Sequence, residues 1–259
     1  MSAVVTAVVA VFGLLFGSFT TVLASRVPEG RGVVSGRSAC PRCGEQIRWH
    51  DNIPVLSWLV LHGRCRSCGA PISWTYPVIE LAVALLWVLV HLRYGLSWTS
   101  AVLWILAVAS VALFVIDVRH HRLPHRIVLP AYGLVSVPIV IAWLTGERSS
   151  WGTAALGLAV MGGFYGLLWF LYPKGMGFGD VTTAGLLGLV LGFLGLEHLA
   201  VGAIAGPLAG GLMVVVLAAM GRARKGTAVP YGPALLVGAW IGILVGPAIA
   251  QGYIDLLIG

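Results

Sequence analysis

Charged residues are scarce in this sequence, making up only 10% of its 259 residues, and just nine residues are acidic. A soluble domain of average composition carries about 25% charged residues. The shortage excludes an ordinary water-soluble enzyme, a disordered tail and a coiled coil. The chain also has no basic residue before its first apolar run, so we expect no secretory signal peptide.

Apolar residues are abundant instead: 59% of the chain is hydrophobic, with 35 glycines and 10 tryptophans. Runs of about 20 apolar residues are long enough to cross the hydrocarbon core of a bilayer. The sequence therefore predicts an all-α polytopic membrane protein, with a first transmembrane helix (1–25), a polar loop (26–76) and a transmembrane helical domain (77–259). About eight spans are expected, at residues 3–25, 77–92, 97–116, 127–144, 151–171, 181–196, 199–220 and 231–254.

The basic residues indicate which way these spans run. Fourteen of the 16 lie in connections that follow odd-numbered spans, seven of them in the loop 26–76, and the two exceptions are Arg93 and Arg148. Basic loops stay on the cytoplasmic side, so the loop is predicted to be cytoplasmic and both termini external. Little more than Glu197 and His198 separates the sixth and seventh spans, so the two could form one span and the total could be seven. The alternation of basic and non-basic connections favours eight. The net charge of +7 is explained by topology, and no nucleic-acid partner is expected.

All four cysteines lie in the loop, in two Cys-x-x-Cys-Gly motifs with 21 residues between them. Two such motifs predict a tetrahedral four-sulfur zinc site, which is structural because no position is left for water. Disulfides are disfavoured because cytoplasmic thiols stay reduced; a rubredoxin-like iron site and a metal-free loop remain alternatives. His50 and His62 lie between the motifs and are expected to be ordinary surface or packing residues. The predicted ligands are Cys40, Cys43, Cys65 and Cys68.

Two carboxylates stand out because ionisable groups next to a membrane span are costly. Asp117 ends the third span and Asp180 begins the sixth, on the same side of the membrane, so they can meet if these spans pack together. Two carboxyl groups that share a proton in a poorly hydrated site are the equipment of an aspartic protease. The glycines of residues 175–179 would let backbone, or an extended peptide, come close to Asp180. An ion or proton pathway also remains open, as does a structural role in which each Asp caps a helix or pairs with Arg119, Arg122 or Lys174.

The other acidic residues have plainer interpretations. Glu80 lies one turn into the second span, where a hydrogen bond to the loop is favoured over a functional role. His120, His121 and His125 follow Asp117 and could tune it, although a basic interfacial loop explains them more simply. The six remaining acidic residues are expected to be solvated: Glu29, Glu45, Asp51, Glu147, Glu197 and Asp255.

Motifs in order along nearly the whole chain resemble the bacterial type IV prepilin leader peptidases, a family of intramembrane aspartic endopeptidases. A lone Gly-x-Gly-Asp would be a weak signal, but here the cysteine loop and both aspartate motifs occur in register. The motifs are Gly17-Ser18-Phe19, Arg26-Val27-Pro28, Cys40 to Cys43, Asp51 to Trp58, Gly63 to Cys68, Ile72-Ser73, Tyr76 to Glu80, Ile116-Asp117, Leu123-Pro124, Gly175 to Val181 and Val229 to Pro233.

The resemblance implies cleavage of the short basic leader from prepilins and pseudopilins, on the cytoplasmic side of a glycine. Asp117 and Asp180 match the family's catalytic aspartates. Many members also methylate the new N-terminal amine with S-adenosylmethionine, an activity associated with the cysteine-bearing loop. No fingerprint for that donor is recognisable, and Glu80 is the one candidate for its site. The implied partners are prepilins and the lipid bilayer, while the oligomeric state stays open.

This chain departs from the family pattern at three positions: the family usually has Asn at Thr21, Asp at His125 and Lys at Thr182. The change at Thr182 removes a cation two residues from Asp180, and His125 could supply part of the missing charge. Because neither aspartate is altered, proteolysis is still expected. Methylation is less well supported, since Thr21 lies in the N-terminal region tied to it.

Two functions of other classes compete with the peptidase. A transporter could use the intramembrane carboxylates for proton coupling, in which case Asp180→Asn would abolish solute flux. A membrane-anchored zinc-ribbon adapter would carry out no chemistry, and would depend on its cysteines but not on its aspartates.

Overall fold

The computed structural model describes residues 2–34, 36, 38–147, 151–173, 175–220 and 231–258. Over this part of the chain the regular secondary structure is helical, apart from two isolated β-bridges in the cysteine loop. Several residues used in the sequence argument lie outside the described ranges: Arg37, Arg148, Lys174, Arg222, Arg224, Lys225, Val229 and Pro230.

Eight long helices occupy the eight predicted spans. Seven of them are long and apolar enough to cross a membrane, and α7, with 17 residues, is a shorter apolar helix of about 25 Å. The helices are α1 (Ala3–Arg26), α3 (Thr75–Tyr94), α4 (Trp98–His120), α5 (His125–Leu144), α6 (Trp151–Leu171), α7 (Phe178–Leu194), α8 (Leu196–Ala219) and α9 (Gly232–Ile258), with a 3-10 turn η1 (Trp49–Asn52) and a short helix α2 (Leu56–Val60) in the loop.

The break between α7 and α8 is a single residue. Gly195 has φ +140°, a backbone angle that favours glycine, and it ends α7 and begins α8. The predicted separator was therefore placed too late: Glu197 lies in the first turn of α8, and His198 is buried within that helix, where its Nδ1 lies 2.8 Å from the carbonyl oxygen of Gly242.

The chain forms two compact units. The first contains Met1–Leu96 with the α4 segment Ala107–Ala112, and the second contains Ser97–Leu106 and Leu113–Gly259. None of the boundaries between these units lies at residue 77, because α3 packs with α1 in the first unit. The domain division expected at residue 77 stays a prediction.

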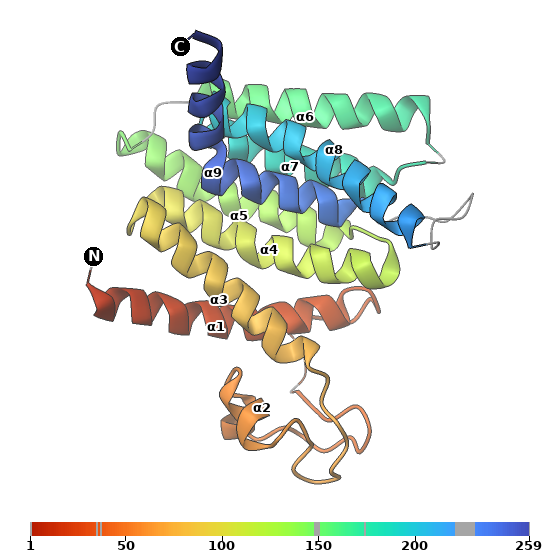
Figure 1. Ribbon diagram of the computed structural model, residues 1–259. Coiled ribbons are helices and arrows are strands. Elements are labelled where there is room, and N and C mark those ends of the chain that lie inside the picture. Colours follow the sequence, from red (N-terminus) through yellow and green to blue (C-terminus); the bar gives the residue numbers. More distant parts are fainter. Residues whose placement is uncertain are drawn as a thin grey trace. The chain divides into compact units, whose positions relative to one another are not determined.

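In the first unit, α1 and α3 cross in close contact (Figure 1). The glycines of a small-xxx-small pattern, Gly13 and Gly17, lie at this crossing. A Cβ at Gly13 would lie 2.7 Å from Ala84 Cα, and one at Gly17 would lie 2.6 Å from Glu80 Cα. Glycine is required at both positions because nothing larger fits between the two backbones.

In the second unit, α6 packs along α7 and α8 packs along α9 (Figure 1). The α6–α7 contact again depends on glycines, since a Cβ at Gly157 or Gly188 would collide with the carbonyl oxygen of the other. Glu147, expected to be solvated, is exposed but also has a structural role. Its carboxylate accepts hydrogen bonds from the amides of Trp98 and Thr99, both at 2.9 Å, and so caps the N-terminus of α4.

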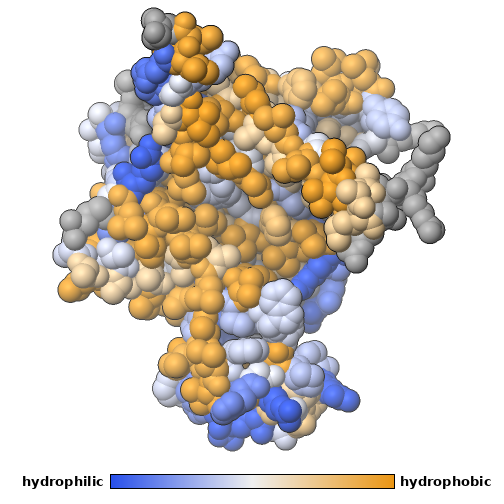
Figure 2. Space-filling view, viewed as in Figure 1, coloured by the Kyte–Doolittle hydropathy of each residue, from blue (hydrophilic) through white to orange (hydrophobic). Residues whose placement is uncertain are grey.

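The surface of the long helices is dominated by apolar residues, whereas hydrophilic residues gather on the cysteine loop (Figure 2). This distribution is expected for a multi-pass membrane protein with one polar loop. The loop follows the first span, as predicted.

Candidate active site and metal centre

Asp117 lies in the last turn of α4 and is only 5% exposed. Its Oδ2 accepts a hydrogen bond of 3.0 Å from the backbone amide of Gly232, the first residue of α9. A Cβ on Gly232 would lie 2.7 Å from that same oxygen. Glycine therefore lets the α9 backbone approach the carboxylate directly, and the amide fixes one of its two oxygens.

Asp180 occupies the first turn of α7 and forms a cap with its own helix. Its Oδ2 accepts a hydrogen bond of 3.1 Å from the amide of Gly177, the residue that precedes the helix. The adjacent Gly179 lies against the connection between α4 and α5, since a Cβ there would be 2.5 Å from the carbonyl oxygen of Leu123. The glycine-rich segment thus allows the close approach that the sequence predicted, and the described neighbour is Leu123.

The structure brings the two aspartates together. Their carboxyl groups are close enough for the charge of Asp117 to act on Asp180. The link between them is Leu123, which approaches both Gly179 of α7 and Gly232 of α9. The two aspartates are thus linked through the α4–α5 connection and the start of α9, and direct contact between their carboxyl groups stays a prediction.

Two tyrosines beside this pair were not predicted. The hydroxyl groups of Tyr165 (α6) and Tyr231, just before α9, lie 2.8 Å apart, and both side chains interact electrostatically with Asp180. Tyr231 and Gly232 belong to one of the motifs that resemble the family. The Tyr-Gly-Pro sequence at the start of an apolar run could therefore have identified Tyr231 as a site residue. Tyr165 lies mid-helix in an apolar sequence and gave no such signal.

Two positions where the chain departs from the family pattern contact each other. Thr182 Oγ1 lies 3.3 Å from His125 Nδ1 and also donates a hydrogen bond of 3.1 Å to the carbonyl oxygen of Gly179. His125 therefore stands next to the position where the family carries a lysine. Of the other histidines, His121 caps the end of α4 with φ +52° and interacts electrostatically with Asp117.

We expect Gly232→Ala to lower the activity of this site by about 100-fold, because the new methyl group must displace the Asp117 carboxylate, and a shift of about 1 Å in a catalytic group has that order of effect. The measurement is the rate of leader cleavage by the purified variant. Gly252→Ala, on the same helix but with open space around its Cβ, is the matched control and should retain the wild-type rate. Equal rates for the two variants would contradict the close approach.

The four cysteines form one cluster, as predicted, with their sulfur atoms all within 4.8 Å of one another. Cys40 and Cys68 from the two motifs have their Sγ atoms 3.9 Å apart. A tetrahedral site with zinc–sulfur bonds of about 2.3 Å requires sulfur–sulfur distances of about 3.8 Å. The four thiols therefore fit a metal ion, and neither His50 nor His62 belongs to the cluster.

The two motifs have the same backbone geometry. In the first motif, the amide of Cys40 donates to the carbonyl oxygen of Glu45, and the amide of Gly44 donates to the carbonyl oxygen of Cys40. In the second, the amide of Cys65 donates to Ala70 O and that of Gly69 to Cys65 O. Both glycines have positive φ, 73° and 68°. The backbone amides of Cys43 and Arg42 point at the Cys40 sulfur and lower the pKa of that thiol to about 6. Amides that stabilise a thiolate also prepare it to bind a cation.

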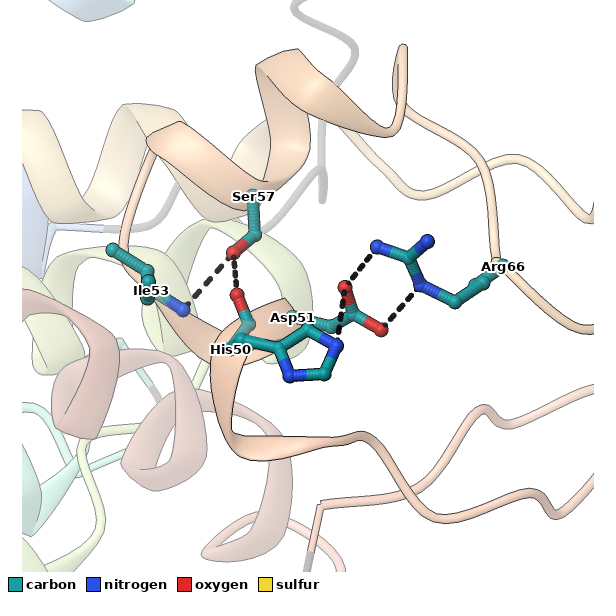
Figure 3. A network of polar contacts seen from close by, with 5 residues as sticks. All are labelled: His50, Asp51, Ile53, Ser57 and Arg66. Atoms are coloured by element: carbon teal, nitrogen blue, oxygen red, sulfur yellow. Dashed lines mark hydrogen bonds and ion pairs between the residues drawn. The ribbon is translucent and has the colours of Figure 1, made fainter.

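A polar network braces this loop (Figure 3). Asp51 accepts two hydrogen bonds from Arg66, at 2.8 and 2.6 Å, and Arg66 lies between the cysteines of the second motif. These bonds lower the pKa of Asp51. The side chain of Asp51 is only 9% exposed, so the prediction that it is solvated was wrong. Ser57 closes the network by accepting from the Ile53 amide and donating to the carbonyl oxygen of His50.

Glu80 forms the hydrogen bond to the loop that the sequence favoured. It is 7% exposed, and its Oε2 accepts from the amide of Val55 at 2.7 Å. Val55 has φ +61° and ψ −51° within a three-residue turn closed by the Leu56 amide and Pro54 O, a strained conformation for a β-branched residue. Glu80 thus stabilises an unfavourable turn and fastens the loop to α3.

We expect Glu80→Leu to loosen this attachment by about 1–3 kcal/mol, because the partly buried Val55 amide would lose its acceptor. Limited proteolysis of the loop measures the effect, as a faster cut near Val55. Glu80→Gln keeps an acceptor oxygen and should be cut at close to the wild-type rate. The contact has no such structural role if both variants resist protease as wild type does.

Two family models match the chain: the bacterial peptidase A24 N-terminal domain over residues 11–94, and the type IV leader peptidase family over residues 104–221. The prepilin leader peptidase/N-methyltransferase of Pseudomonas aeruginosa is 32% identical over 277 residues, which cover 94% of this chain and 91% of the relative. The chain belongs to the type IV leader peptidase family. It is thus a membrane-bound enzyme, and the second family match contains both Asp117 and Asp180.

Two further relatives have the same name as the Pseudomonas aeruginosa protein. Those of Stutzerimonas stutzeri and Bacillus subtilis are 32% and 31% identical, and the alignments cover 95% and 96% of this chain and 92% and 98% of the relatives. The N-terminal family match contains α1 from residue 11 onward, the cysteine loop and α3. No solved structure matches the chain with significance.

Proposed function

We propose that this leader peptidase removes the basic leader peptide from type IV prepilins and pseudopilins at the cytoplasmic face of the membrane, with Asp117 and Asp180 as its catalytic carboxyl groups. The observation that carries the proposal is that these two carboxyl groups, 63 positions apart in the sequence, lie near enough to interact electrostatically, each with one oxygen held by a backbone amide. The family membership agrees with this substrate class.

The pair can perform peptide hydrolysis without a covalent intermediate. One carboxylate takes a proton from a water molecule, which attacks the carbonyl carbon of the scissile bond, while the other carboxyl group donates its proton to the carbonyl oxygen. Collapse of the tetrahedral intermediate releases the leaving amine, which takes up a proton from the pair. The amides of Gly232 and Gly177 hold one oxygen of each aspartate, so the pair is oriented before substrate binds. Because the two groups titrate as a pair, the shared proton belongs to neither alone.

The orientation proposed for the protein follows the basic residues. The N-terminus is external, and the cysteine loop and the two aspartates face the cytoplasm of a bacterial cell. A prepilin presents its leader on that same side, and its mature N-terminus begins a membrane helix. The substrate bond would therefore reach the aspartates at the membrane boundary.

The metal that we propose for the four cysteines is zinc, in a structural role. Four thiolates complete its tetrahedral coordination, and the ion would supply folding energy to a loop too small to bury a core of its own. The chain's own part is to present the sulfurs from two matching turns and to brace the second turn through Asp51 and Arg66.

We also propose that the enzyme methylates the new N-terminal amine, with S-adenosylmethionine as the donor. The support is the name that the relatives share. Glu80, the candidate for the donor site, uses its carboxylate to hold Val55, so no catalytic step is assigned to it.

Mass spectrometry of a prepilin co-expressed with this protein tests the proposal. The expected spectrum shows a chain without its leader and with a methyl group on the new N-terminus. A prepilin without its leader and without the methyl group would support the proposed peptidase activity and contradict the proposed methyltransferase activity. An uncut prepilin, with the peptidase present in the membrane, would overturn both.

A further inference from the structure

The short helix α2 of the cysteine loop has one exposed apolar face. Leu56, Leu59 and Val60 are 54%, 56% and 62% exposed, and their spacing places them on the same side of the helix. The opposite side is packed against the loop: Ser57 is buried, and the indole N–H of Trp58 donates to Ile72 O at 3.1 Å. Three exposed apolar side chains on one side of a short helix call for an apolar environment.

Glu80 joins the start of α2 to α3, a helix long and apolar enough to cross a membrane. This residue is the sixth of α3, so it lies about 7–8 Å along that helix from its first residue. Its hydrogen bond holds Val55, the residue immediately before α2, at the same depth. Val78 and Leu81 of α3 are exposed to 48% and 51% at this level. Leu56, the first residue of the apolar face of α2, directly follows the residue held at this level of α3.

The figures agree with this placement. Within the first unit, the loop folds back alongside α1 and α3, with α2 on the side nearer the N-terminus of α1 (Figure 1). On the face shown, apolar residues gather on that side of the loop, and hydrophilic residues lie along its lower edge (Figure 2).

The same loop carries exposed aromatic residues and an excess of basic ones. Trp49, in the turn η1 that contacts α2, is 83% exposed, and Trp74, immediately before α3, is 66% exposed. Tryptophan is enriched where a membrane meets water. The loop 26–76 holds seven arginines against three acidic residues, a charge that attracts anionic headgroups and repels a basic leader peptide. The charge therefore favours lipid over substrate as the partner of this face.

We propose that α2 is an interfacial membrane anchor, which inserts Leu56, Leu59 and Val60 among the acyl chains of a leaflet with anionic headgroups. The cysteine loop is then held against the bilayer and not free in solution, with Trp49 and Trp74 at headgroup level. This anchoring is independent of peptidase activity, because it rests on exposure, depth and charge alone.

Photo-crosslinking tests the anchor in the full-length protein. A benzophenone amino acid is placed at Leu59 and, in a second chain, at Val60, and each protein is reconstituted in bilayer discs containing phosphatidylglycerol and a co-reconstituted prepilin. Val34 is the control position, since it is apolar, 94% exposed and in the same loop but outside α2. Metal content confirms that each labelled loop is folded.

The expected result is a several-fold higher yield of lipid adducts from positions 59 and 60 than from position 34, falling when phosphatidylcholine replaces the anionic lipid. Equal adduct yields at all three positions would overturn the proposal. So would products at 59 and 60 that join the label mainly to the prepilin or to a second copy of the chain. A yield that is high but independent of headgroup charge would overturn the role given to the arginines.

Discussion

Asp117→Asn and Asp180→Asn are each expected to lower the rate of leader cleavage by about a thousandfold, within the range for loss of a general acid or base. Asparagine has nearly the same shape as aspartate but can neither take a proton from water nor give one to the peptide carbonyl. The measurement is cleavage of a prepilin by the purified enzyme in phospholipid vesicles, followed over time.

These variants keep the local structure, which makes the result interpretable. The amide oxygen of an asparagine can still accept the hydrogen bond from Gly232 at position 117 or from Gly177 at position 180. Asp255→Asn is the matched control because Asp255 is exposed near the end of α9 and accepts a hydrogen bond from Gln251, one turn earlier in the same helix. Wild-type cleavage by the Asp117→Asn enzyme would contradict its assigned role.

The double variant Cys40→Ser, Cys65→Ser is expected to lose its metal almost completely, from about one equivalent per chain to near zero. Two of four thiolates cannot complete a tetrahedral site, and structural zinc in small domains contributes apparent binding energies of about 10–16 kcal/mol at pH 7. The loop should then unfold while the long helices persist. Metal analysis and limited proteolysis of residues 26–76 measure the two effects.

Ser67→Ala is the control for this variant, since it lies in the second Cys-x-x-Cys motif without providing a sulfur. It should retain the metal and the protease resistance of the loop. If the double cysteine variant keeps a full equivalent of metal, the four-thiolate site is wrong. Iron in place of zinc in the wild-type protein would correct the choice of metal but not the ligands.

The membrane architecture could be predicted closely because hydrophobic length is a local property of the sequence. Each of the eight helices falls within a few residues of its predicted span. The cysteine cluster was equally accessible, because two matching motifs fix both the ligands and the turn geometry. The break at Gly195 was placed too late, since the preceding apolar run gives no sign of a single residue with positive φ.

The contacts that join distant segments could not be predicted in the same way. Nothing near Asp117 in the sequence shows that Gly232 donates to it, and nothing near Asp51 shows that Arg66 covers it. Both contacts join residues that are far apart in the sequence, by 115 and 15 positions respectively, so they depend on the tertiary fold. Residue preferences for backbone conformation also do not predict the strained turn at Val55, because β-branched residues rarely adopt positive φ.

The central claim is that Asp117 and Asp180 act as one catalytic unit, and the rates of the two single variants and the double variant test it most directly. If the carboxyl groups share one proton-transfer task, the double variant should cleave no more slowly than either single variant, because the first substitution already disables the pair. Rate losses that multiply in the double variant would contradict a shared unit, as would a single variant that cleaves prepilin at the wild-type rate.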